Sequence, residues 1–95
     1  AMLSGAWLAT LNGANQIDRG LEAGAAANEA IYLASEACSA ATDAAVQTLG
    51  GIAFSLDQSI ERLSRESRLL RLAPVSQEMT LNYLARSVLG LARHY

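Results

Sequence analysis

The sequence contains no lysine, and it has only one residue each of cysteine, proline, histidine, tryptophan and phenylalanine. A single cysteine forms neither an internal disulfide nor a cysteine-rich zinc site, so we expect no disulfide and no metal site. All seven basic residues are arginine, nine residues are acidic, and the net charge is −2. Nucleic-acid binders usually carry a basic surface, so the composition argues against DNA or RNA as a partner.

A long uncharged apolar run is also missing. The most apolar stretch begins at Leu21 and is interrupted at every seventh position by an acidic residue. These residues are Glu22, Glu29, Glu36 and Asp43. A membrane-spanning helix needs about 20 predominantly apolar residues, and the start of the chain lacks the basic residues of a secretory signal. We therefore expect no membrane span and a cytoplasmic location, and we interpret Ala1, which precedes Met2, as the remnant of a removed tag.

Small apolar residues dominate what is present. Hydrophobic residues make up 52% of the 95 positions, and 19 of them are alanine. Alanine favours helices, and its small side chain allows helices to pack closely. A chain of this length is long enough for one domain only. We predict a single all-α domain over residues 1–95, an up-and-down bundle of three to four helices with one long central helix.

The helix boundaries follow from turn and capping residues. Asn12-Gly13 predicts the end of a first helix, and Gly50-Gly51 predicts the end of a second one. The Ser55 to Gln58 segment reads as a capping box that starts a third helix, and Pro74 separates the third helix from the fourth. The predicted helices span residues 3–12, 16–49, 56–72 and 75–93.

The second helix should be about 50 Å long at 1.5 Å per residue. Its four acidic residues lie on one stripe, which we interpret as a solvated face. The other predicted helices are too short to cover its alanine-rich surface, and large exposed apolar areas normally mark an interface. The geometry therefore predicts a homodimer or a homotetramer.

Two charged patterns leave alternatives open. The acidic stripe could hold a metal, but di-iron helical bundles use Glu-x-x-His pairs, and no histidine lies on this helix. Four arginines at three-residue steps could bind phosphate, but acidic residues lie among them, which favours surface ion pairs. These arginines are Arg62, Arg65, Arg68 and Arg71.

Two consecutive segments carry a resemblance to a known family. The segment 45–54 reads AVQTLGGIAF, and the segment 60–72 reads IERLSRESRLLRL. Together they resemble the C-terminal helical domain of the acyl-CoA dehydrogenases, in which a Gln-x-x-Gly-Gly-x-Gly-Tyr turn precedes a Glu-Arg-x-x-Arg-Asp-Ala-Arg helix. The segment 84–90 is similar to the family's final Ile-Ala-Arg-x-Leu-Leu-Gly. The resemblance covers about Leu3 to Leu91.

The resemblance implies a cofactor and partners. Members of this family are usually homotetramers that hold one FAD per subunit, with electron-transfer flavoprotein as a partner. By resemblance, Gln47 and Gly51 reach the FAD of a neighbouring subunit. Ser76, where the family has threonine, and Glu78 lie in a segment that lines the same cofactor.

One departure bears on catalysis. The position of the family's catalytic glutamate, which abstracts the α-proton of the acyl thioester, is Pro74 here, and proline cannot accept a proton. Ala53 and Val75 replace two family glycines. The first hypothesis is the C-terminal part of an acyl-CoA dehydrogenase-like FAD flavoprotein, inactive as this chain alone, with a full-length dehydrogenase subunit as a further candidate partner. The second is a non-catalytic helical oligomerisation module or degenerate partner subunit.

Overall fold

The computed structural model describes residues 1–92. Over this range the chain forms four α-helices, one 3₁₀ helix and no strand, which confirms the all-α prediction. The elements in chain order are α1 (Met2–Asp18), α2 (Gly24–Leu49), η1 (Gly50–Phe54), α3 (Ile60–Leu69) and α4 (Gln77–Ser87).

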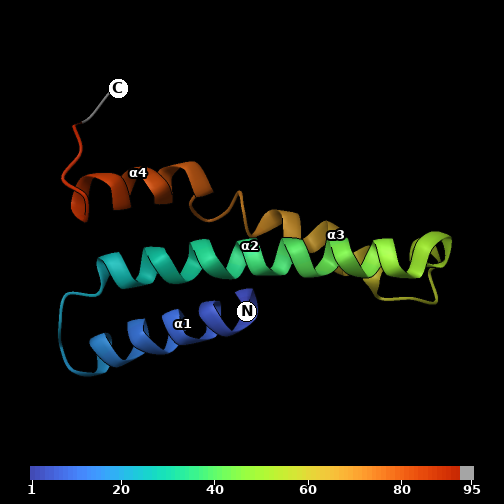
Figure 1. Ribbon diagram of the computed structural model, residues 1–95, viewed down its shortest axis with the longest axis horizontal. Helices are drawn as coiled ribbons and strands as arrows, with labels where there is room; N and C mark the ends of the chain where they lie inside the picture. The colour runs from blue at the N-terminus through green and yellow to red at the C-terminus, as the bar shows by residue number, and fades with distance from the viewer. Residues whose placement is uncertain (93–95) are drawn as a thin grey trace.

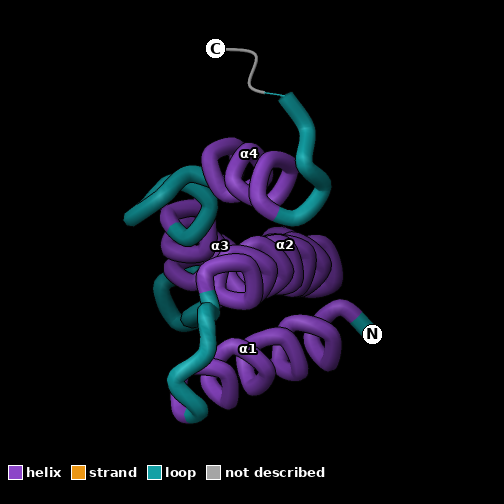
Figure 2. Tube along the Cα trace, turned by 90° about the vertical axis from the view of Figure 1, so that its left-hand side faces the viewer, coloured by secondary structure: helices purple, strands orange, loops and turns teal. Residues whose placement is uncertain are grey.

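Helix α2 lies at the centre of the molecule. Helix α1 runs antiparallel along one side of it, and α4 lies on the opposite side, with α3 preceding it along α2 (Figure 1). The end-on view shows α1 below α2, α4 above it, and α3 beside α2 at about the same height (Figure 2). The described chain is elongated, with extents of 46 × 34 × 22 Å. A small bundle around one long helix is therefore confirmed.

The predicted boundary between the first two helices is wrong. Helix α1 continues through Asn12-Gly13 to Asp18, and Gly20, with φ 68°, makes the turn instead. Gly13 is buried, and a β-carbon there would lie 3.7 Å from the backbone of Ala26. Gly13 thus lies at the contact between α1 and α2. Helix α2 has 26 residues rather than the expected 33 or so.

The junction between α2 and α3 matches the prediction at one end only. Helix α2 ends at Leu49, and Gly50 adopts φ 63°, so the expected glycine stop is confirmed. The capping box is wrong, because the Ser55 hydroxyl accepts from the amide of Asp57 at 3.3 Å. This local turn and the 3₁₀ helix η1 delay the start of α3 to Ile60, and α3 ends at Leu69 rather than at residue 72.

Helix α4 is shorter than predicted. It begins after Ser76, whose hydroxyl accepts from the amide of Met79 at 3.3 Å, as an N-cap does. It ends at Ser87, and Gly90, with φ 67°, lies just beyond the helix. The last residue of the predicted helix, Arg93, lies outside the described residues.

The interior contains small side chains, whereas large apolar side chains lie outside. The buried apolar residues among those described are Ala6, Ala26, Ala37 and Ala53. On α1, the side chains of Leu3, Trp7 and Leu8 are 77%, 63% and 65% exposed. These three residues form an apolar stripe along α1, and other described residues leave most of its surface uncovered.

Candidate functional site

The two cofactor candidates at the end of α2 are open to solvent. Gln47 is exposed on the last turn of α2, and Gly51 is exposed at the start of η1. No atom lies within 4 Å of a β-carbon placed on Gly51. The backbone at this turn can therefore be approached closely by a ligand.

The other two candidates lie at the start of α4. The oxygen of the Ser76 hydroxyl caps the helix, and its hydrogen remains able to donate to a ligand. Glu78 is exposed in the first helical turn. Gln77, between them, is buried and holds this end of α4 against α2.

The structure does not bring the four candidates into one cluster. The Gln77 amide donates to the carboxylate of Glu36 at 2.7 Å, so the start of α4 lies level with this position of α2. Gln47 lies 11 residues further along the same helix, which is about 16 Å at 1.5 Å per residue. The four candidates therefore lie at two separate places on the molecule.

A polar network that the sequence did not reveal fixes the start of α4. The Arg71 guanidinium donates to the amide oxygen of Gln77 at 2.7 Å, and its other arm pairs with Glu36 at 2.7 Å. The Gln77 amide nitrogen also donates to the hydroxyl of Ser35 at 3.0 Å. Both carboxamide atoms of a buried glutamine are thereby satisfied. The network joins α2, the end of the α3 region and α4.

This network corrects the interpretation of the acidic stripe. Glu36 was expected on a solvated face, but its side chain is only 32% exposed and engaged in the network. Glu22 lies in the turn before α2, where it accepts from the amide of Gly24 at 2.7 Å. Glu29 and Asp43 are exposed on α2, as expected. The stripe is thus a solvated face only in part.

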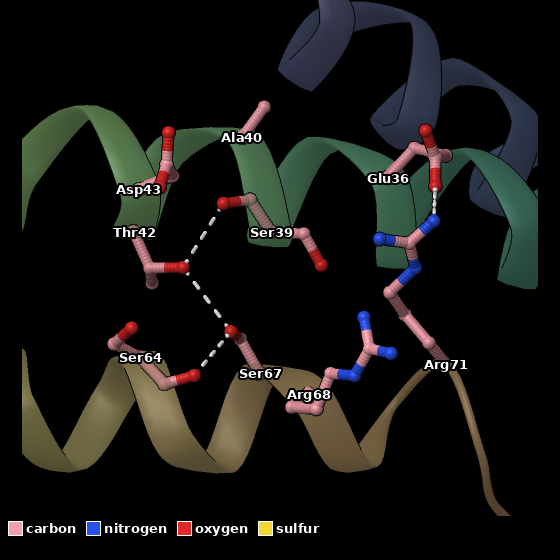
Figure 3. A pocket seen from close by; sticks show the side chains of 9 residues that line it. All are labelled: Glu36, Ser39, Ala40, Thr42, Asp43, Ser64, Ser67, Arg68 and Arg71. Carbon is pink, nitrogen blue, oxygen red and sulfur yellow. Dashed lines mark hydrogen bonds and ion pairs between the residues drawn. The ribbon is translucent and has the colours of Figure 1, made fainter.

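A polar groove of about 410 Å³ lies between α2 and α3 (Figure 3). In its middle the Thr42 hydroxyl lies 3.1 Å from the hydroxyl of Ser67, which also donates to the carbonyl of Ser64 at 2.9 Å. The charged residues that line it are Glu36, Asp43, Arg68 and Arg71. The hydroxyl pair joins the two helices without a large apolar contact.

The expected surface ion pairs on α3 are present. Arg65 binds the carboxylate of Glu61 with two nitrogens, and Arg62 lies 3.7 Å from Glu66. The hydrogen bond from Arg65 lowers the pKa of the Glu61 carboxyl below its ordinary value. Of the four arginines at three-residue steps, Arg68 alone has no ion pair within the described residues.

A second groove, which is apolar, lies between α1 and α2. Its volume is about 360 Å³, and four residues of α1 and four small residues of α2 line it. The lining residues are Leu3, Ala6, Trp7, Thr10, Ala34, Ala37, Cys38 and Ala41. The lining of this groove thus combines large apolar side chains of α1 with small side chains of α2.

Comparison with known proteins gives a consistent result. The model of the family described as "Acyl-CoA dehydrogenase, C-terminal domain" matches residues 1–89. The chain belongs to the acyl-CoA dehydrogenase family. Acyl-CoA dehydrogenase FadE12 of Mycobacterium tuberculosis and that of Mycobacterium bovis are each 44% identical over 90 residues. The match covers 93% of this chain and 23% of each relative, so the chain spans about a quarter of their length. No solved structure matches it.

Two predicted departures from the acyl-CoA dehydrogenase family can now be located in the structure. Pro74, at the predicted position of the family's general base, is exposed and lies two residues before the α4 cap. Its side chain has no group that accepts a proton. Ala53, for which the resemblance predicts a family glycine, is 1% exposed, so its methyl group lies in the interior and leaves the surface of the turn open.

Two further classes of site are not found. No group of three or more histidine, cysteine, aspartate or glutamate residues is placed to hold a metal ion within residues 1–92. None of the helices in this part of the chain is long and apolar enough to cross a membrane.

Proposed function

We propose that the chain is the C-terminal helical part of an acyl-CoA dehydrogenase-like FAD flavoprotein and that it contributes subunit assembly and cross-subunit contacts to FAD. The observation that carries the assembly role is the exposed apolar stripe of α1 beside the apolar α1/α2 groove. Exposed apolar surface of this kind usually marks an interface. A homodimer or homotetramer would cover it.

The residues present fit the cofactor at two points. The exposed turn at Gly51 allows close approach of a dinucleotide, with the amide of Gln47 beside it. At the start of α4, the Ser76 hydroxyl and the positive end of the helix suit a phosphate group, whereas the Glu78 carboxylate would have to face a hydroxyl or an amide. When bound, FAD supplies the hydride acceptor for oxidation of acyl-CoA to enoyl-CoA.

The cofactor contacts can be tested in a chimera. Residues 1–90 would replace the matching segment of the 44%-identical mycobacterial relative, and FAD per subunit would be measured by absorbance after gel filtration. We expect Gln47→Ala and Gly51→Val to lower FAD occupancy. Gln58→Ala, at an exposed position outside both contact points, is the matched control. Full occupancy in all three variants would refute the proposed contacts.

Pro74 favours a second candidate function. A subunit without a general base at this position can still assemble with a full-length dehydrogenase subunit. It can also complete the cofactor site of that subunit. On that alternative the chain is a non-catalytic helical oligomerisation module or a degenerate partner. Restoring glutamate in the chimera discriminates the two, because Pro74→Glu should raise dehydrogenase activity only if the acyl site is otherwise intact. A cytoplasmic location remains part of the same proposal. Electron-transfer flavoprotein as a partner rests on the resemblance.

A further inference from the structure

One end of the polar groove between α2 and α3 carries more positive charge than its own chain neutralises. The guanidinium groups of Arg68 and Arg71 both point into the end of the groove that lies toward α4 (Figure 3). Glu36 pairs with Arg71 at 2.7 Å. The side chain of Arg68 makes no hydrogen bond or ion pair within residues 1–92. Two guanidinium groups thus share this end of the groove with a single carboxylate, which pairs with only one of them.

The other charged groups nearby do not balance Arg68. Asp43 lies at the opposite end of the groove, next to Thr42 on α2 and across the groove from Ser64 (Figure 3). On α3, the carboxylates of Glu61 and Glu66 pair with other arginines and do not line the groove. The excess positive charge is therefore confined to the end that Arg68 and Arg71 share.

Hydrogen-bond donors also exceed acceptors at this end. The hydroxyl of Ser39 is buried and has no hydrogen-bond partner in the described structure. Figure 3 shows this hydroxyl pointing into the groove from α2, toward the two arginines. Arg71 uses its Nε and Nη2 atoms for Gln77 and Glu36, so its Nη1 atom keeps its protons free. An entering group with several acceptor oxygens would satisfy these donors.

We propose that this end of the groove binds a phosphate group, either as free phosphate or as a phosphate monoester. A tetrahedral dianion accepts hydrogen bonds from two guanidinium groups and a hydroxyl at once, and guanidinium groups match phosphate oxygens in charge and geometry. A second carboxylate would offer only two oxygens in one plane. The site goes beyond the proposed function, because none of the four FAD candidates lines the groove.

Nuclear magnetic resonance on the whole chain tests the proposal directly. Inorganic phosphate, glycerol 3-phosphate and acetate are titrated separately at constant ionic strength, and the arginine Nε–H signals are followed. We expect a saturable shift of the Arg68 signal with either phosphate compound and at least about tenfold weaker binding of acetate. Tighter binding of glycerol 3-phosphate would assign a phosphate ester as the ligand, and equal binding would assign free phosphate. An equal response to acetate, or no saturable response, would overturn the site.

Two matched variants separate the site from general charge effects. Arg68→Gln should weaken phosphate binding at least about tenfold. The fold should survive this change, since Arg68 is exposed and makes no contact that the change would break, and the melting temperature without phosphate checks this. Arg62→Gln removes the same charge from the same helix outside the groove and should leave binding unchanged. Equal phosphate affinity in Arg68→Gln and the unaltered chain would contradict the proposal.

Discussion

Gly50 determines where the central helix ends. Its φ of 63° and ψ of −143° lie close to a region that is essentially restricted to glycine and that costs a residue with a side chain about 1 to 3 kcal/mol. Gly51, the next residue, does not share this positive φ, and its surroundings are open. The two glycines of the turn therefore have different roles, and only the first is needed for the backbone geometry.

Substitution by alanine distinguishes these roles. We expect Gly50→Ala to lower the free energy of unfolding by about 1 kcal/mol. Gly51→Ala should change it by less than about 0.5 kcal/mol, because neither strain nor a contact opposes the new methyl group. Urea unfolding followed by circular dichroism measures both. Equal stability of the two variants would show that Gly50 is not strained.

Glu36 is the residue that links α2 to the start of α4. Its carboxylate accepts from both Arg71 and the amide of Gln77. We expect Glu36→Ala to cost about 1 to 3 kcal/mol, since it leaves partly buried donors without an acceptor. Glu29→Ala, on the exposed part of the same helix, is the control and should cost little. Equal unfolding free energies for the two variants would contradict the role given to the network.

At the scale of elements, the contact between α1 and α2 depends on their close approach at Gly13. A β-carbon at this position would lie 3.7 Å from the backbone of Ala26, which is an ordinary van der Waals contact. Gly13→Ala should therefore fit and stabilise the protein by up to about 1 kcal/mol through higher helix propensity. Gly13→Leu should push the helices apart and destabilise it. The melting temperatures of both variants test this, and a stabilising leucine would contradict the close packing.

The stability that the Glu61–Arg65 pair of α3 contributes should depend on pH. Its pKa is lowered chiefly by the hydrogen bond from Arg65, so the pair stabilises the folded state above the ordinary pKa of 4.5. That contribution is lost as pH falls through the lowered pKa. We expect the melting temperature of Glu61→Gln to lie slightly below that of the unaltered chain at pH 7. In strong acid the two melting temperatures should be the same. A difference that persists in acid would refute this assignment.

The sequence predicts some elements and misses others for physical reasons. The end of α2 is encoded locally by two adjacent glycines, so a local pattern sufficed. Gly13 carries the same local turn signal, but its packing against Ala26 keeps it helical. The contact between Gln77 and Glu36 joins residues 41 positions apart, and no spacing rule reveals it before the chain is folded. The family motif suggested the candidate cofactor positions. The distance between the turn at Gly51 and the start of α4 became visible only in three dimensions.

On the scale of the whole molecule, the described chain resembles a part of a larger interior. Its buried residues are mostly alanine and small polar residues, and its large apolar side chains lie on the surface. Such an arrangement is unfavourable in a monomer, because exposed apolar area normally becomes buried in an interface. The chain spans about a quarter of the length of its relatives, and the exposed stripe of α1 belongs to a domain of this family.

Charge placed on the proposed interface should disrupt it. Ala34 and Ala41 line the apolar groove between α1 and α2. We expect Ala34→Arg and Ala41→Arg to dissociate the assembly, since an arginine would be buried without a partner. Glu29→Arg, at an exposed position that lines none of the described grooves, should leave it intact. Sedimentation velocity compares the three, and unchanged assembly in both alanine variants would place the interface elsewhere.

The molar mass of the purified chain in solution tests the central claim most directly. Multi-angle light scattering coupled to gel filtration, at micromolar concentration, measures it without reference to shape. If the apolar stripe of α1 and the adjoining groove form a subunit interface, the mass will be that of two or four chains. A single species with the mass of one chain would contradict the account.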